Sequence, residues 1–456
     1  MELNKILSEQ KKYFQTGATL PVDFRKEKLK LLKEVIKDSQ EEICAALKKD
    51  LGKSSFESFM CEIGLVLEEI SFMIKNIKKL SSEKRVKTPL VNFPSKSYQK
   101  PTPYGNTLII SPWNYPFLLT MGPLVDALAA GNTAIIKPSK NSLATTKVMG
   151  KIIRLCFKEN YVYLVDKDID KARDLIKEKF DFIFFTGSSS VGKEVLKNAD
   201  EHLTPVVLEL GGKSPCIVDK TADIALAAKR IVFGKFLNCG QTCVAPDYVL
   251  CHKSIVKDLQ RELCVQTERQ YGINPFENKN YGKIISERHF ERLKNLIEPA
   301  KIILGGKTKK TTLQIAPTIM TDISWQDAIM QEEIFGPILP ILTFENLEEV
   351  IFLLNQKPKP LALYLFTSDK QAIKQITSRV QYGGGCINDT IIHLATTQMP
   401  FGGVGESGMG SYHGAEGFKT FSHTKSIVDK KTWLDFPVRY SPYKELYLKL
   451  LQFLLG

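Results

Sequence analysis

Apolar residues recur at helical spacing through the first part of the chain. In the segment LKLLKEVIKDSQEEICAALKKDL, residues 29–51, leucines and isoleucines return every three or four positions, and Lys and Glu fill many of the positions between them. This spacing places the apolar side chains on one face of a helix and the charged ones on the other. The pattern therefore predicts a helical opening over residues 25–80.

Short apolar runs replace this pattern farther along the chain. Residues 96–112, KSYQKPTPYGNTLIISP, alternate like strands interrupted by Pro and Gly, and we expect a strand pair near residues 97–110 that serves oligomerisation. The runs NTAIIK and FDFIFF follow, each beside a segment with helical spacing. Strands that alternate with helices predict a parallel sheet wound with crossover helices.

A second series of the same kind follows the glycine pair in LELGG. The segments SPCIVD, DYVLCHK, ILPILTF and LALYLFT have the pattern of strands, and IALAAKRIVFGKF has that of a helix. The fold class is therefore α/β, with one domain over residues 1–209 and a second over residues 210–398. Residues 399–456 form a third segment, a glycine-rich loop followed by an arm.

The composition is that of a globular protein, with 43% hydrophobic and 25% charged residues in a chain of 456. The net charge of +13 is dispersed along the chain, and no nucleic-acid-binding motif accompanies it. We therefore expect no nucleic-acid partner. A basic surface can still help to recruit an anionic cofactor.

The nine cysteines are irregularly spaced, and the opening MELNKILSEQKKYF is not a secretion signal. Free thiols in a reducing cytosol are expected, which predicts a cytoplasmic protein. Cysteines 239, 243 and 251 and His252 lack the paired spacing of a zinc site, and no metal is expected.

The C-terminal residues ELYLKLLQFLLG are strongly apolar but only a dozen long, whereas a membrane-spanning helix needs about 20 residues. They predict a helix buried against the body or against a partner subunit. A peripheral membrane contact is the alternative.

A glycine turn follows the apolar run in FIFFTGSSSVGKEV, residues 182–195. Gly187 and Gly192 imitate a triphosphate-binding loop, but Glu194 stands where that loop needs Ser or Thr for magnesium. Ser189 replaces the second glycine of the dinucleotide fingerprint. A helix that starts after a strand binds anions readily, so the turn is either an anion site or a structural element.

The segment NCGQTCVAPDY, residues 238–248, can present a thiol to a bound carbonyl, with backbone amides near it. The alternative is a buried, inert cysteine. The local pattern does not distinguish Cys239 from Cys243.

Three further motifs hold polar residues beside turns. Glu209 ends an apolar run before two glycines, and is either paired with a buried cation or tuned as a base. Asn114, between two prolines in SPWNYPF, either donates to an oxyanion or bonds its own backbone. Glu333 and Phe335 in EEIFGP either bind sugar hydroxyls and pack against a ring, or contribute to folding alone.

The order of these motifs resembles the aldehyde dehydrogenase superfamily. PWNYP, KPS, FTGSSSVGKEV, LELGGKSP, GQTC, EEIFGP and PFGGVGESGMG follow one another as in that family, and CVAPDYVL is similar to its class 3 branch. The resemblance covers about residues 14–444. It implies a Rossmann-like cofactor domain, a catalytic domain, NAD or NADP as cofactor, a small-molecule aldehyde as substrate and a homodimer.

The resemblance also implies roles for single residues. It places Cys243 on the nucleophile, Glu209 on the general base and Asn114 on the oxyanion donor. The residues that it assigns to the cofactor are Trp113, Lys137, Gly187, Ser188, Gly192, Glu333 and Phe335.

Two departures from the family pattern concern the cofactor. Lys140 stands where many NAD-using relatives carry Glu, and an ammonium there would attract a 2′-phosphate that a carboxylate repels. We therefore expect NADP to be accepted. The segment YVYLVDKDI, residues 161–169, lacks glycines often found there, which is expected to alter the edge of the cofactor pocket.

The predicted activity is oxidation of apolar aliphatic or aromatic aldehydes to carboxylic acids with NAD(P)+, through a cysteine thiohemiacetal and a thioester. Three alternatives remain at this point. They are an acyl-transferring aldehyde reductase on the same fold, a P-loop NTPase and a non-catalytic oligomerising protein.

Overall fold

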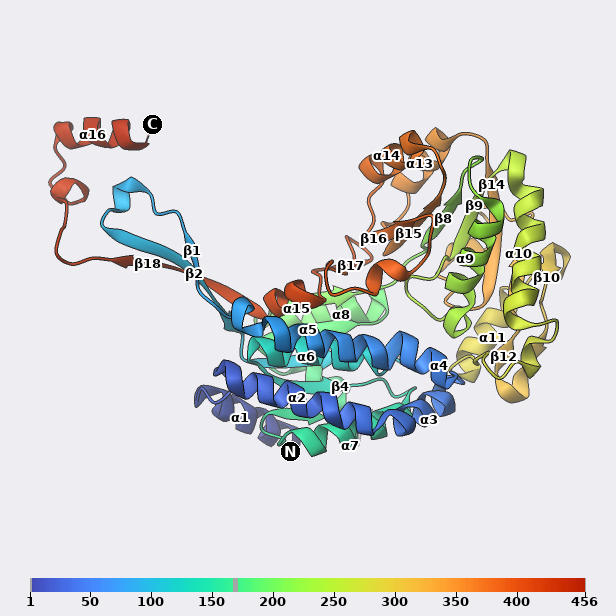
Figure 1. Cartoon of the computed structure of the whole chain (residues 1–456), viewed down its shortest axis with the longest axis horizontal. Helices are drawn as coiled ribbons and strands as arrows, with labels where there is room; N and C mark the ends of the chain where they lie inside the picture. The colour runs from blue at the N-terminus through green and yellow to red at the C-terminus, as the bar shows by residue number, and fades with distance from the viewer. Residues whose placement is uncertain (1, 167–170, 456) are drawn as a thin grey trace.

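The computed structural model describes residues 2–166 and 171–455 and has two α/β bodies and a projecting arm (Figure 1). The predicted α/β class is confirmed. The helical opening is confirmed as well, and its apolar positions Leu29, Leu32, Ile36 and Leu47 are fully buried. The helices of this opening are α1 (Glu2–Gln15), α2 (Val22–Asp38), α3 (Gln40–Leu51), α4 (Ser55–Ser58), the π-helix η1 (Phe59–Ile63) and α5 (Gly64–Leu80).

The first sheet has the strand order β17-β7-β6-β3-β4-β5. Its parallel strands are β3 (Asn106–Ile110), β4 (Thr133–Lys137), β5 (Val162–Leu164), β6 (Phe182–Thr186) and β7 (Val206–Glu209). The short strand β17 (Gly408–Met409) pairs antiparallel with β7. The crossover helices are α6 (Leu118–Ala130), α7 (Leu143–Cys156) and α8 (Ser189–Asp200).

Strand β3 shows why the central strands are apolar throughout. Leu108 and Ile110 pack in the core on the side of α1 and α8, whereas Ile109 packs in the core of α2, α5 and α6. Because both faces of a parallel sheet are covered, its strands are continuous apolar runs rather than alternating ones. The carboxyl ends of these strands lie at one edge of the sheet, where Lys137, Thr186 and Glu209 end β4, β6 and β7.

The second sheet has the order β10-β13-β14-β9-β8-β15-β16 and is parallel except at β10. Its strands are β8 (Pro215–Val218), β9 (Tyr248–His252), β10 (Ile302–Leu304), β13 (Thr318–Met320), β14 (Ile338–Phe344), β15 (Ala362–Phe366) and β16 (Gly384–Ile387). A two-stranded sheet of β11 (Thr308–Lys309) and β12 (Gln314–Ile315) lies apart from it. The helices of this body are α9 (Ile224–Phe236), α10 (Val256–Tyr271), α11 (Glu287–Asn295), α12 (Ala328–Gln331), α13 (Leu347–Asn355) and α14 (Lys370–Arg379).

A three-stranded sheet forms the base of the arm (Figure 1). It consists of β1 (Lys84–Val86), β2 (Ser95–Pro103) and β18 (Ser422–Lys430), with β18 reached through α15 (Gly414–Thr420). The expectation of a strand pair near residues 97–110 was wrong, because β2 pairs with β1 and β18 whereas β3 belongs to the first sheet. The sequence break at Pro103 and Gly105 separates an exposed ribbon from a buried strand.

The chain ends in α16 (Glu445–Leu455), which lies at the far end of the arm, away from both α/β bodies (Figure 1). Burial of this helix against the body, one of the two expectations, was therefore wrong. Leu446 is 72% exposed and Phe453 is 85% exposed. Among the described residues, no helix is both long and apolar enough to cross a membrane.

Candidate active site

The segment around Cys243 is held in an unusual backbone conformation. It follows α9 through the turn η4 (Leu237–Gly240), in which Asn238 and Cys239 have φ of 51° and 52° and Gly240 has φ of 72°. Non-glycine residues rarely adopt this left-handed region, and they persist there only where surrounding contacts enforce it. The chain therefore reverses sharply just before the thiol.

Hydrogen bonds enforce this turn from several sides. The Asn238 side-chain amide donates to the backbone carbonyl of Asn114 at 2.8 Å and to that of Gln241 at 3.1 Å. The Gln241 side chain donates to the carbonyl of Lys283 at 3.0 Å and accepts from the backbone N–H of Ile285 at 3.0 Å. Residues 238–248, called the nucleophile segment after the role expected of Cys243, are thus attached both to the turn after β3 and to the loop before α11.

The structure separates the two cysteines that the motif left equivalent. Cys239 is 2% exposed and packs in the core of the second body. Burial raises its pKa far above the ordinary value. Cys243 is half-buried and lines an apolar cavity of about 160 Å³.

The thiol of Cys243 has a pKa raised to about 12. Burial is the main cause, and the negative charges of Glu333 and Glu209 add to it, whereas the backbone N–H groups of Cys243 and Val244 oppose it. Because only the thiolate is a good nucleophile, a proton acceptor is needed for its activation.

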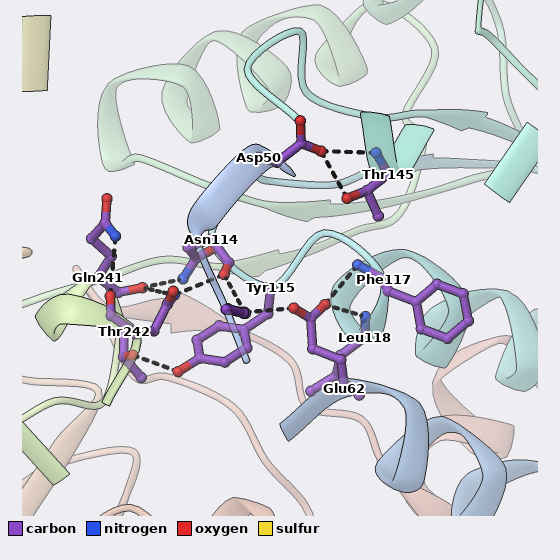
Figure 2. A network of polar contacts seen from close by, with 11 residues as sticks. Asp50, Glu62, Asn114, Tyr115, Phe117, Leu118, Thr145, Gln241 and Thr242 are labelled. Atoms are coloured by element: carbon purple, nitrogen blue, oxygen red, sulfur yellow. Dashed lines mark hydrogen bonds and ion pairs between the residues drawn. The ribbon is translucent and has the colours of Figure 1, made fainter. Parts of the chain in front are cut away.

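Asn114 is 3% exposed and lies in the turn between β3 and α6. Its side-chain amide donates to the Gln241 carbonyl at 3.1 Å, two residues from Cys243. The neighbouring Tyr115 hydroxyl lies 2.7 Å from the hydroxyl of Thr242. Figure 2 shows these contacts side by side, so the turn and the nucleophile segment are joined at two successive residues.

Glu209 ends β7 and is 2% exposed. Within the described part of the chain, neither carboxylate oxygen has a hydrogen-bond partner. Burial without a partner disfavours the charged form, so the pKa of Glu209 is raised well above its ordinary value. The described residues therefore contain no buried cation that is hydrogen-bonded to this carboxylate.

Glu333 approaches the glycine pair that follows Glu209. A β-carbon at Gly211 would lie 2.8 Å from the carboxyl carbon of Glu333, closer than such contacts permit. Burial, and then the charge of Asp247, raise the pKa of Glu333 to about 8, although the backbone N–H of Gly212 donates to the carboxylate and lowers it. The glycine pair therefore makes room for this side chain, as its position after a strand suggested.

The loop that carries Glu333 is tied to the nucleophile segment through Asp247. One oxygen of Asp247 accepts from the backbone N–H of Ile334 at 3.0 Å, and the other lies 2.6 Å from the ammonium of Lys213. Next in this loop is Phe335, with φ of 49°, and its ring packs edge-on against Trp113 at 5.4 Å. Trp113 and Phe335 therefore lie together, as a shared cofactor site requires.

The glycine turn at the start of α8 lies at the carboxyl end of β6. The N–H of Gly187 donates to the carbonyl of Glu209 at 3.0 Å, and a β-carbon at Gly192 would lie 2.9 Å from Leu210. Ser188 precedes the helix, but its hydroxyl lies 3.1 Å from that of Ser190 and makes no capping bond. The glycines thus bring the turn close to the strand end that carries Glu209.

A second and larger cavity, about 560 Å³, lies beside this turn. Its lining includes Ser189, Lys193, Gly211, Lys213 and Glu333. The helix start and the two lysines favour an anion, and the Glu333 carboxylate offers an acceptor for hydroxyl groups. The residues present therefore fit a dinucleotide.

The other two residues expected to bind the cofactor lie at the end of β4 and in the turn that follows it. Lys137 is half-buried at the end of that strand, and Lys140 is exposed in the turn before α7. The segment 161–169 includes β5, but its residues 167–169 lie outside the described part of the chain. The expected effect of that segment on the cofactor pocket therefore stays a prediction.

Comparison with known proteins shows the family. The profile of the aldehyde dehydrogenase family matches residues 1–427. The 4,4′-diaponeurosporen-aldehyde dehydrogenase of Staphylococcus aureus is 48% identical over 96% of this chain and 95% of its own length. The dimeric, NADP-preferring aldehyde dehydrogenase of Canis lupus familiaris is 41% identical over 97% of this chain and 98% of its own. A substrate-bound structure of Staphylococcus aureus AldH superposes with a TM-score of 0.97 at 46% identity, covering 99% of each chain.

The chain belongs to the aldehyde dehydrogenase family. It is an enzyme that oxidises aldehydes to carboxylic acids with NAD or NADP as cofactor. The resemblance stated from the sequence motifs is confirmed, and the alternatives of an NTPase or a non-catalytic protein are not favoured.

Sequence reasoning missed several buried polar residues around the site. Tyr115 and Thr242 are adjacent to Asn114 and Cys243 in the chain, and this adjacency was the available signal. Lys235 on α9 is fully buried, and burial lowers its pKa to about 8. It shares α9 with the basic residues Lys229 and Arg230, and the sequence gives no sign that Lys235 is the buried one.

Proposed function

We propose that Cys243 is the nucleophile, with Asn114 as oxyanion donor and Glu209 as general base. The observation that supports this most is the position of Cys243, which lines the apolar cavity while its thiol lies under the influence of Glu209 and Glu333. Of the two cysteines in the motif, Cys239 lies in the core instead. Aldehyde, thiol and base can therefore meet at one place.

The reaction then proceeds in two halves. The Cys243 thiolate adds to the aldehyde carbon, and the Asn114 amide and the Cys243 backbone N–H hold the oxyanion. Loss of hydride from that carbon leaves a thioester on Cys243. Glu209 takes a proton from a water that attacks the thioester, and this releases the carboxylic acid and the Cys243 thiolate. The proton then passes from Glu209 to solvent. The raised pKa of Glu209 suits a base that works near neutral pH.

The cofactor, when bound, accepts the hydride. Glu333 would hold the nicotinamide ribose and Lys137 the adenosine ribose. The turn with Gly187, Ser188 and Gly192 would hold the diphosphate, and Trp113 and Phe335 would pack beside it. The cavity beside Glu333, with its helix start and lysines, supports this placement.

The nucleophile is tested by the absorbance of the reduced nicotinamide during turnover of a panel of aldehydes. Cys243→Ala is expected to lower kcat by about 10³-fold or more, because it removes the thiol proposed to form the thioester. Cys239→Ala should stay within about five-fold of wild type, since it removes only core packing. Activity retained by the first variant and lost by the second would reverse the assignment.

Lys140 favours the 2′-phosphate of NADP. Charge is the reason, because an ammonium attracts that phosphate and a carboxylate repels it. Lys140→Glu is expected to lower kcat/KM for NADP about 10-fold or more relative to NAD. If wild type strongly prefers NAD, this proposal fails.

The substrates are apolar aldehydes, aliphatic or aromatic. The cavity beside Cys243 is lined almost wholly by hydrophobic side chains, among them Leu118, Leu119, Phe233, Leu237 and Phe401. Each buried methylene adds about 0.8 kcal/mol of transfer free energy. kcat/KM should therefore rise with chain length in a series of straight-chain aldehydes, and equal values across the series would contradict an apolar pocket.

The enzyme is a cytoplasmic homodimer whose arm contacts the second copy. The exposed apolar side chains of α16 support this, since no described part of the chain covers Leu446, Leu448 or Phe453. The Canis lupus familiaris relative is named dimeric. Binding of α16 to a membrane surface is the alternative, and cosedimentation with anionic lipid vesicles distinguishes the two.

A further inference from the structure

Lys53 and Glu62 form an ion pair that is completely buried. Lys53 lies between α3 and α4, Glu62 lies in the π-helix η1, and both side chains are 0% exposed. The ammonium and the carboxylate oxygen Oε1 are 2.5 Å apart. Both residues belong to the amphipathic opening of the chain, where charged side chains are expected on the solvent face.

The ammonium of Lys53 reaches the turn that carries Asn114. It donates to the backbone carbonyl of Asn114 at 3.0 Å and lies 3.8 Å above the centre of the Tyr115 ring. The side-chain amide of Asn238 donates to the same carbonyl oxygen at 2.8 Å. Two donors from different elements therefore fix one peptide group of this turn.

The carboxylate of Glu62 holds the other side of the same turn. Its second oxygen accepts from the backbone N–H of Phe117 at 2.8 Å and from that of Leu118 at 3.2 Å (Figure 2). These N–H groups open α6, whose own N-cap residue makes no side-chain cap. A carboxylate at a helix N-terminus satisfies free N–H groups and suits the helix dipole.

The pair is thus hydrogen-bonded to the turn at the Asn114 carbonyl and at the N–H groups of Phe117 and Leu118. The Asn114 side chain extends toward the nucleophile segment, where it donates to the Gln241 carbonyl. Stability does not explain why a charged pair is buried here. An ion pair in a protein interior contributes little net stability compared with apolar residues of similar volume. What the pair supplies is a fixed geometry, and a short π-helix of this kind often marks a functional site.

We propose that Lys53 and Glu62 are positioning residues for the oxyanion site. They hold the backbone of Asn114 so that its amide stands where the aldehyde oxygen becomes negatively charged. This inference rests on the role proposed above for Asn114.

Lys53→Met and Glu62→Gln test the pair, since both keep the side-chain volume. Three quantities are measured: kcat at saturating cofactor, the Kd of the reduced cofactor, and the rate at which iodoacetamide alkylates Cys243. Alkylation forms no oxyanion, so it reports the thiol alone. We expect kcat to fall about 10- to 100-fold, with Kd and alkylation within about two-fold of wild type, because transition-state stabilisation depends on donor placement. Equal losses in all three quantities, or an unchanged kcat, would overturn the proposal.

A double-mutant cycle shows whether the pair acts through Asn114. Groups that act as one unit are not additive, so Lys53→Met in an Asn114→Ala background should lower kcat by no more than about two-fold further. Additive losses would contradict the inference. If Asn114→Ala alone leaves kcat unchanged, the proposed function of Asn114 fails; if only the Lys53 and Glu62 variants are silent, this inference fails and that function stands.

Asp50 provides a matched control. Its carboxylate accepts from the backbone N–H groups of Ala144 and Thr145 at the start of α7, as Glu62 does at α6, but it does not contact the Asn114 turn (Figure 2). Asp50→Asn should therefore leave kcat at saturating cofactor within about two-fold of wild type. Should Lys53→Met fail to fold, Glu62→Gln decides, because its amide keeps the shape and an acceptor oxygen of the carboxylate.

Discussion

The junction between the two α/β bodies buries polar side chains, whereas the arm exposes apolar ones. At the junction, the polar groups of the nucleophile segment bond within one chain, through Asn238, Gln241 and Asn114. On the arm, large apolar side chains such as Phe453 and Leu446 face outward from α16. The first region is complete in a single copy, whereas the second exposes a surface of the kind that marks an interaction site.

The same contrast assigns the chemical reaction to the junction and assembly to the arm. Glu209 is buried without a hydrogen-bond partner among the described residues, which costs stability and suits the general base that we propose it to be. The apolar face of α16 lowers solubility unless another surface covers it. Substitution of a destabilising buried residue at the junction, such as Glu209, is therefore expected to change the reaction rate. Substitution of exposed apolar residues of α16 is expected to change assembly.

The largest expected effect comes from Glu209→Gln. The amide cannot take a proton from water, so kcat should fall by about 10²- to 10⁴-fold. Tm should change little, because the amide has the shape of the carboxyl group and is buried without a partner in the same way. Steady-state kinetics and thermal unfolding of the same preparation check both. A variant that stays active but unfolds at lower temperature would make Glu209 a structural residue.

Removal of residues 436–456 should change assembly but leave cofactor binding almost unchanged. We expect the dimer to dissociate to monomers in sedimentation velocity, since the apolar surface of α16 is lost. Cofactor binding should change by less than about three-fold, because the junction is complete within one chain. An unchanged dimer would exclude this part of the arm as the main contact.

The smallest effect concerns pH. The pKa of Glu333 is about 8 in the folded chain and ordinarily about 4.5, so ionising it opposes folding as pH rises between these values. The stability of wild type relative to Glu333→Gln should therefore fall between pH 5 and pH 8, by roughly 2–5 °C in Tm. A Tm difference that is the same at both pH values would show that Glu333 is not held in this environment.

The sequence predicted strands better than it predicted their partners. Apolar runs such as NTLII and FIFF identified β3 and β6, because strands covered on both faces must be apolar throughout. The pairing of β2 with β18 joins residues 95–103 to residues 422–430, and no local pattern contains that information. Proximity along the chain suggested β3 as the partner of β2 instead.

Motifs identified candidate residues of the site, but they could not show which side chains are buried. Family resemblance selected Cys243 as the expected nucleophile, and the structure shows that Cys243 lines a cavity whereas Cys239 lies in the core. Lys53 and Glu62 could not be found in this way. A charged residue in an amphipathic segment is usually solvated, and only the folded chain shows which ones are enclosed.

Gly211 restricts how far sequences of this kind can diverge. Every other amino acid would place a carbon against the carboxyl group of Glu333. A lineage that replaced this glycine would have to move the carboxyl group of Glu333 away from the strand end that also presents Glu209. A position with no functional group of its own can therefore determine where a neighbouring acid lies.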